Sequence, residues 1–132
     1  MLIGRFGVER IAERLPRLMR ATRAAGLNSV WMSDPMHGNT RLRGGIKLRR
    51  IEDILGELAS FFAIARAERI HPAGVHLEMT ALGVTECIGG RGPASLDELG
   101  RNYLSACDPR LNHDQALDMA GEIARLGARV PA

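Results

Sequence analysis

The 132-residue sequence is poor in several residue types. Aromatic residues make up only 4% of the chain, too few for the stacking surfaces with which proteins bind single-stranded nucleic acids. It has two cysteines, Cys87 and Cys107, and these are too few for the disulfide framework of a small secreted domain. No run of about 18 apolar residues is present, so we expect no membrane-spanning helix and no membrane partner.

The first residues, MLIGR, lack the long apolar stretch of a signal peptide. Together with the low cysteine content, this predicts a reduced, cytoplasmic setting. The chain has a formal net charge of +3, and its only lysine is Lys47, so arginine carries nearly all of the positive charge. Arginine suits bidentate contact with carboxylate and phosphate groups. Because the arginines are scattered along the chain, we expect anionic metabolites rather than nucleic acid as partners.

The length fits a single domain over residues 1–132 and is too short for a complete (β/α)₈ barrel, which needs about 250 residues. Apolar periodicity predicts short strands over residues 2–4, 29–32 and 75–79, and a long amphipathic helix over 49–68. A first main helix is predicted to open at Pro16, after a short helical turn, and to stop at Gly26. Capping patterns predict two further helices, beginning at Ser95 and Asn112. The glycine-bearing segments 33–47 and 83–92 are predicted to be loops.

The predicted order is therefore β-α-β-α-β-α-α, an α/β fold with three parallel strands. Three strands leave two sheet edges unpaired. Because an unpaired edge exposes a row of backbone hydrogen-bonding groups, we expect association to cover them.

Polar residues follow the predicted strands at their carboxyl ends, where α/β proteins place their chemistry. Arg5 follows the first strand, Asp34 and His37 follow the second, and Glu78 lies at the end of the third. Asp108 lies between the last two helices. A histidine and two carboxylates on one rim would bind a divalent cation such as Mn²⁺, Fe²⁺, Co²⁺ or Zn²⁺. Arg5 on the same rim would bind a phosphate or a carboxylate.

Four segments are more specific than this spacing: DPMHGNT at 34–40, GVHLE at 74–78, VTECIGG at 84–90 and CDPRLN at 107–112. In these four motifs and in their order along the chain, the sequence resembles the class II (plant-type) 3-deoxy-D-arabino-heptulosonate 7-phosphate (DAHP) synthases. LIGRFG at 2–7 is similar to a further strand of that family. The resemblance covers essentially the whole chain and matches the C-terminal part of the family's barrel. It implies a truncated domain with the last three units of a (β/α)₈ TIM barrel, completed by a homo-oligomer or a complementary synthase chain.

The resemblance also implies an activity. The family condenses phosphoenolpyruvate with erythrose 4-phosphate in the shikimate pathway of aromatic amino acid biosynthesis, with a divalent metal that polarises the aldehyde. By position, His37, Glu78 and Asp108 resemble three of the family's metal ligands. Arg5 resembles an arginine that binds phosphoenolpyruvate, and His37 and Arg5 are the expected catalytic residues. Mn²⁺ or Co²⁺ is the favoured metal, with Fe²⁺ or Zn²⁺ as alternatives. The family's fourth ligand, a cysteine from its N-terminal half, has no counterpart here.

Several roles stay open at this point. Asp34 either orients His37 or forms a turn, and Asp108 is either a ligand or a turn residue. Arg5 either binds substrate or is a solvated side chain near the terminus. Cys107 is either a redox-sensitive neighbour of the metal or a small buried hydrophobe. Two alternative functions also remain: a non-catalytic module that binds a metabolite or pairs with a synthase, and a metal-dependent lyase or aldolase acting on a related phosphorylated keto acid.

Overall fold

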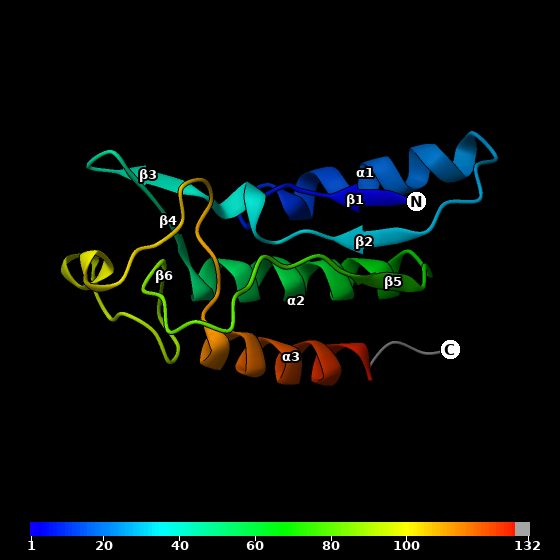
Figure 1. Ribbon diagram of the computed structural model, residues 1–132. Helices are drawn as coiled ribbons and strands as arrows, with labels where there is room; N and C mark the ends of the chain where they lie inside the picture. The colour runs from blue at the N-terminus through cyan, green and yellow to red at the C-terminus, as the bar shows by residue number, and fades with distance from the viewer. Residues whose placement is uncertain (129–132) are drawn as a thin grey trace.

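The computed structural model describes residues 1–128. Within them the chain forms six strands and three α-helices (Figure 1). In chain order the elements are β1 (Leu2–Gly4), α1 (Ile11–Ala24), β2 (Trp31–Ser33), β3 (Arg41–Arg43), β4 (Ile46–Arg50), α2 (Ile51–Ala67), β5 (Pro72–Val75), β6 (Cys87–Ile88) and α3 (His113–Gly127). Two 3₁₀ helices, η1 (His37–Asn39) and η2 (Leu96–Arg101), lie in the connections.

The main sheet has the order β1-β2-β5 and all three strands are parallel. The predicted α/β class with three parallel strands is therefore confirmed. Backbone hydrogen bonds continue the pairing beyond the strand ends, from Asp34 N–H to Gly4 O and from His76 N–H to Ser33 O, both at 2.8 Å. These bonds hold the three segments that leave the carboxyl end of the sheet beside one another.

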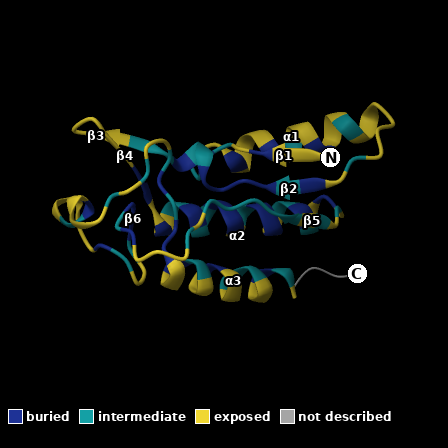
Figure 2. Ribbon diagram, viewed as in Figure 1, coloured by how far each residue is buried: buried dark blue, intermediate teal, exposed yellow. Residues whose placement is uncertain are grey.

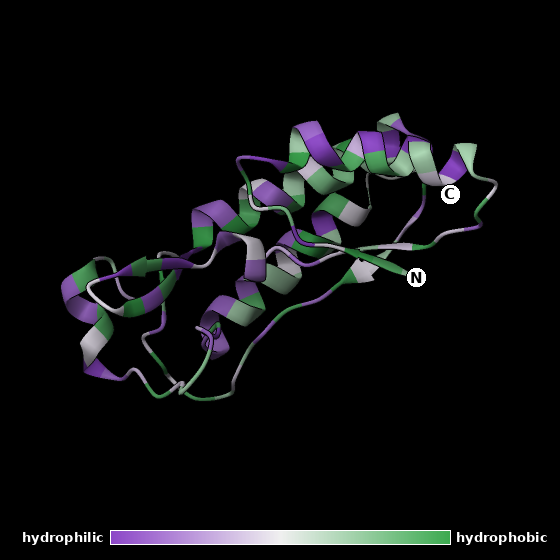
Figure 3. Ribbon diagram, turned by 90° about the horizontal axis from the view of Figure 1, so that it is seen from above, coloured by the Kyte–Doolittle hydropathy of each residue, from purple (hydrophilic) through white to green (hydrophobic). Residues whose placement is uncertain are grey.

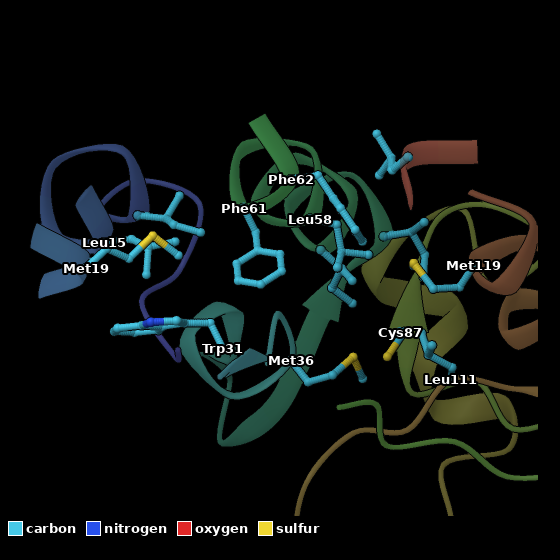
Figure 4. Packing of buried hydrophobic residues seen from close by; sticks show 14 residues of the cluster. Leu15, Met19, Trp31, Met36, Leu58, Phe61, Phe62, Cys87, Leu111 and Met119 are labelled. Carbon is cyan, nitrogen blue, oxygen red and sulfur yellow. The ribbon is translucent and has the colours of Figure 1, made fainter. Parts of the chain in front are cut away.

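The helices lie on one side of the sheet (Figure 3). Helix α2 packs against both α1 and α3, and its buried stripe of Ile54, Leu58, Phe61 and Phe62 forms the centre of the core (Figure 4). The outer faces of α1 and α3 are exposed (Figure 2). No helix within residues 1–128 is long and apolar enough to cross a bilayer.

The segment between His37 and Lys47, predicted as a loop, instead contains an antiparallel hairpin of β3 and β4. Gly44 and Gly45 form its two-residue turn with φ angles of 56° and 81°, a conformation that glycine adopts without strain and that favours tight hairpins. Polar and apolar residues alternate on both sides of Gly44-Gly45, in RLR and IKLR, which is a hairpin pattern. The prediction missed it because the strands are short and rich in arginine. Strand β4 also pairs in parallel with β6.

The first helix does not open at Pro16. It begins at Ile11, and Pro16 lies inside it. Pro16 removes one helical hydrogen bond, yet the helix continues because Ile11, Leu15 and Met19 bury one continuous stripe in the core. The predicted stop at Gly26 is consistent with a helix that ends at Ala24 and a Gly26 φ of 69°.

Two later predictions are also corrected. The third strand covers Pro72–Val75 rather than 75–79, although Met79 makes an isolated parallel bridge with Leu111. The helix predicted from Ser95 is a six-residue 3₁₀ helix whose Ser95 makes no capping bond. At Asn112 the predicted cap is confirmed, since Asn112 and Gln115 form a reciprocal capping box. Helix α3 therefore begins where the sequence indicates.

Candidate metal and anion site

The turn after β2 orients His37. The buried carboxylate of Asp34 accepts hydrogen bonds from the backbone N–H groups of Met36 and His37, and its Oδ2 lies 2.7 Å from His37 Nδ1. Because an ionised carboxylate can only accept, Nδ1 carries a ring proton, and this is the tautomer in which Nε2 offers a lone pair to a metal ion. The Nε2 atom is thereby directed away from Asp34 as a potential metal ligand.

Asp34 also contacts Arg5, whose Nε lies 2.6 Å from the same Oδ2 atom. Burial acts to raise the pKa of Asp34, but the hydrogen bonds and charge of the His37 segment outweigh it and leave the pKa lowered. Arg5 is half exposed, so its outer nitrogens face solvent while its position is fixed. One buried carboxylate thus links the arginine after β1 with the histidine after β2.

The segments after β1 and β2 are in close backbone contact. A Cβ atom on Gly38 would lie 2.3 Å from the backbone nitrogen of Gly7. Next to it, Val8 N–H donates to Asn39 Oδ1 at 2.9 Å, and Asn39 Nδ2 donates to buried Glu57 at 2.8 Å. Burial raises the pKa of Glu57. Helix α2 is therefore hydrogen-bonded, through Glu57, to the turn that carries His37.

The three predicted metal ligands lie together. His37 Nε2 is 3.5 Å from Glu78 Oε1 and 3.8 Å from Asp108 Oδ2, and the ligand atoms of the three side chains all lie within 4.8 Å of one another. Their side chains are 31%, 30% and 21% exposed, so solvent and ions reach the cluster. We refer to His37, Glu78 and Asp108 as the ligand cluster.

Two positively charged side chains each bind one oxygen of a carboxylate in the ligand cluster. Arg49, on β4 and fully buried, donates to Glu78 Oε2 and also to the Pro109 carbonyl at 2.5 Å. Lys47 Nζ lies 2.7 Å from Asp108 Oδ1, and this hydrogen bond is the main cause of the lowered pKa of Asp108. The remaining oxygens, Glu78 Oε1 and Asp108 Oδ2, face His37 Nε2.

This arrangement fits a divalent cation on its donor set. One imidazole nitrogen and two carboxylate oxygens suit Mn²⁺, Fe²⁺, Co²⁺ or Zn²⁺. Each donor is oriented by a second group: His37 by Asp34, Glu78 by Arg49 and Asp108 by Lys47. Such supporting hydrogen bonds are typical of metal ligands. One Arg49 nitrogen, Nη2, is buried without a hydrogen-bond partner but lies 3.8 Å from Asp108 Oδ2, so Arg49 faces both carboxylates of the cluster.

The two cysteines differ from each other in environment. Cys107, adjacent to Asp108, is exposed, so the interpretation of it as a small buried hydrophobe is wrong. Cys87 is buried, and burial raises the pKa of its thiol to about 12. Neither thiol belongs to a metal-type cluster within the described residues.

Sequence reasoning missed four supporting residues. Lys47 and Arg49 lie two residues apart on β4, and the arginine-rich composition hid the contacts that exposed Lys47 and buried Arg49 make with the carboxylates. Glu57 lies within the apolar stripe of α2, where an acidic residue among core positions is a signal of a buried partner. Glu86 was interpreted as part of a loop fold, but it is fully buried and hydrogen-bonded. Their neighbours in sequence give no indication of these long-range contacts.

The fold and the cluster define an α/β protein with a histidine–carboxylate cluster and an arginine at the carboxyl end of a parallel sheet. A model of the Class-II DAHP synthetase family matches residues 1–124. The chain belongs to this family, as the motifs around His37 and Glu78 indicate.

Three relatives carry the name phospho-2-dehydro-3-deoxyheptonate aldolase. The protein of Streptomyces coelicolor is 42% identical over 94% of this chain, that of Neurospora crassa 44% over 93%, and that of Streptomyces lividans 40% over 94%. The chain spans 28% of the length of the first relative, 26% of the second and 85% of the third.

Proposed function

We propose that this chain supplies the divalent-metal and phosphoenolpyruvate-binding part of a class II DAHP synthase. The reaction condenses phosphoenolpyruvate with erythrose 4-phosphate and releases phosphate. The observation that carries the proposal is the convergence of His37, Glu78 and Asp108, with ligand atoms within 4.8 Å, in a chain of this family. Arg5, joined to His37 through Asp34, adds an anion-binding group beside the cluster.

In this proposal His37, Glu78 and Asp108 hold the metal, and Mn²⁺ or Co²⁺ suits the donor set. When bound, the metal supplies Lewis-acid polarisation of the aldehyde carbonyl. Asp34 keeps the proton on His37 Nδ1, so that Nε2 stays available as a donor. The two outer nitrogens of Arg5 bind the phosphate or the carboxylate of phosphoenolpyruvate, and its Nε stays on Asp34.

We further propose that the chain completes its barrel by association, with a second copy or with a complementary synthase chain. Within the described residues, β1 and β5 each have a free edge, and only one face of the sheet has helices on it (Figure 3). Parallel sheets in α/β proteins are normally covered on both faces. An open groove of about 410 Å³ lies beyond β5 and is lined by Leu77, Met79, Ala116, Leu117 and Ile123 among others. These apolar surfaces favour a partner over solvent.

The test is phosphate release from phosphoenolpyruvate and erythrose 4-phosphate by the purified chain with Mn²⁺ or Co²⁺. Sedimentation velocity run in parallel gives the oligomeric state. We expect turnover that depends on metal and is lost in His37→Ala. The Arg125→Ala variant is a matched surface control, because Arg125 pairs with Glu122 on α3 itself and makes no other ion pair within residues 1–128. A folded chain that binds metal without turnover would reject self-sufficient catalysis.

One observation favours a second function, a non-catalytic module that binds a phosphorylated metabolite or pairs with a full-length synthase. Within the described residues neither thiol belongs to a cluster that could hold a metal ion, so these residues do not supply the cysteine ligand that the resemblance implies. Isothermal titration with phosphoenolpyruvate separates the two functions. Saturable binding that requires Arg5, with no turnover in the assay above, would support the module.

A further inference from the structure

Glu86 lies directly before β6 and outside the ligand cluster. Its side chain is fully buried and accepts five hydrogen bonds. Oε1 accepts from the backbone N–H groups of Leu104 and Ser105, at 3.1 and 2.8 Å. Oε2 accepts from the backbone N–H of Arg110 at 2.8 Å. The Arg110 guanidinium closes the set, with 3.0 Å to Oε2 and 2.7 Å to Oε1.

These contacts attach both ends of one loop to a single carboxylate. Leu104 and Ser105 begin the loop, Arg110 ends it, and Asp108 lies between them. A second bond links this attachment to the ligand, because Ser105 Oγ donates to the Asp108 carbonyl at 2.7 Å. On the opposite side, Arg49 donates to the carbonyl of Pro109. The backbone on either side of Asp108 is therefore held in place.

The carboxylate is suited to this task electrostatically. Burial acts to raise the pKa of Glu86, but the hydrogen bonds from Arg110 and from the loop amides outweigh it and leave the pKa lowered. Glu86 is thus ionised at neutral pH. A buried carboxylate that accepts several charge-assisted bonds holds its partners more firmly than a neutral group of the same shape.

We propose that Glu86 is a positioning residue for the divalent-cation site, acting through the loop at 104–110 to place Asp108 opposite His37 and Glu78. The inference rests on the proposed metal site and assigns Glu86 a part in it. Glu86 itself does not touch the cluster. Within the loop that Glu86 holds, Asp108 is the one member of the ligand cluster, and this makes the role separable from general stabilisation.

The test measures Mn²⁺ affinity by electron paramagnetic resonance on full-length, folded protein. Glu86→Gln keeps the shape of the side chain but removes the charge. We expect its Kd for Mn²⁺ to rise by about 10- to 100-fold, the usual effect of losing a group that supports a metal ligand. Asp108→Asn should weaken binding at least as much. The double variant should bind no more weakly than Asp108→Asn, because Glu86 acts only through that residue.

Glu68→Gln is the matched control. Glu68 is also a buried carboxylate held by arginine, Arg20 at 2.6 Å, but it lies at the C-terminal end of α2, away from the cluster. The Glu68→Gln substitution should lower the melting temperature of the protein and leave its Kd for Mn²⁺ unchanged. Ser105→Ala provides a second variant if Glu86→Gln does not fold, since it removes the two bonds of Ser105 Oγ, to the Asp108 carbonyl and from the Cys107 N–H, both within the loop. It should also weaken Mn²⁺ binding.

Unchanged Mn²⁺ affinity in folded Glu86→Gln, or in Ser105→Ala if the first variant does not fold, would overturn the positioning role while the metal site stands. Fully additive losses in the double variant would also overturn it. A wild-type chain that binds no Mn²⁺ would reject the metal site of the proposed function and the positioning role together. The wild-type titration thus separates the two failures.

Discussion

Asp34 Oδ2 lies 2.7 Å from Nδ1 of His37, and the same oxygen is 2.6 Å from Nε of Arg5. One atom therefore sets both the orientation of the histidine and the position of the arginine. In Asp34→Asn the amide can present a donor to Nδ1, which favours the wrong tautomer and turns the Nε2 lone pair into an N–H. We expect the Kd for Mn²⁺ to rise by about 10- to 100-fold.

Titration of Asp34→Asn with Mn²⁺, monitored by electron paramagnetic resonance, checks this expectation. Asp53→Asn is a suitable control, because Asp53 pairs with Arg41 on the hairpin side of α2. Equal Mn²⁺ affinity in Asp34→Asn and wild type would show that the contact with His37 is a turn contact without effect on the ligand.

The lowered pKa of Glu86 predicts a defined pH dependence of stability. A carboxyl whose folded pKa is below its ordinary value of 4.5 stabilises the fold above that pH and loses its contribution as the pH falls through the lower folded value. The free energy of unfolding of Glu86→Gln should therefore be below that of wild type at pH 7. This difference in unfolding free energy between wild type and Glu86→Gln should narrow below pH 4.5. Urea titrations at several pH values measure the difference. A difference that stays constant at acidic pH would contradict the lowered pKa of Glu86.

The two thiols should react very differently. Cys107 is exposed, whereas the pKa of buried Cys87 is raised to about 12, and only the thiolate is a strong nucleophile. In native protein at pH 8, an aromatic disulfide reagent should modify one thiol rapidly. Cys107→Ser should remove that fast phase, and denaturation should expose one remaining thiol. Two fast thiols in native protein would contradict the burial of Cys87.

The close approach of Gly38 to Gly7 should make residue 38 intolerant of any side chain. An added Cβ would meet the Gly7 nitrogen at 2.3 Å, and backbone atoms cannot move aside as a flexible side chain can. We expect Gly38→Ala to destabilise the fold by about 1–3 kcal/mol and to weaken Mn²⁺ binding, because His37 is its neighbour. Chemical denaturation and metal titration measure the two effects.

Gly121→Ala is the control for that substitution. Gly121 lies within α3, and a Cβ there meets nothing within 4 Å, so alanine should stabilise the helix by about 0.5–1 kcal/mol. A Gly38→Ala variant as stable as wild type would show that the two backbone segments can separate without cost.

Local sequence patterns predicted the parts of the fold that depend on interactions within a single helix. The apolar stripe of α2 and the capping box at Asn112 each lie within one element, and both were found. Pro16 misled the prediction because the burial of Ile11 decides where α1 begins. The start of α1 therefore depends on contacts outside the helix. The hairpin is different, because Gly44-Gly45 lies between two short alternating segments and the signal is local. It was missed because the strands are short and rich in arginine.

The site shows the same division. Family motifs indicated His37, Glu78, Asp108 and Arg5, and the structure brings the first three together and joins Arg5 to His37 through Asp34. The groups that hold them in place could not be found in this way. Arg49 contacts Glu78, and Glu86 contacts the segment around Asp108, only after β4, β6 and the loops have assembled. Such pairings depend on tertiary structure and have no sequence spacing of their own.

The three members of the ligand cluster come from three loops separated by long stretches of chain, and this has a consequence for protein synthesis. When a nascent chain has emerged from the ribosome as far as Glu78, His37 and one carboxylate of the cluster are already outside. Asp108 and its supporting loop are then still in the exit tunnel or not yet translated. Since domains generally fold as they leave the ribosome, the early part of the sheet can form while the cluster is open. The ligand cluster is thus completed only late in translation.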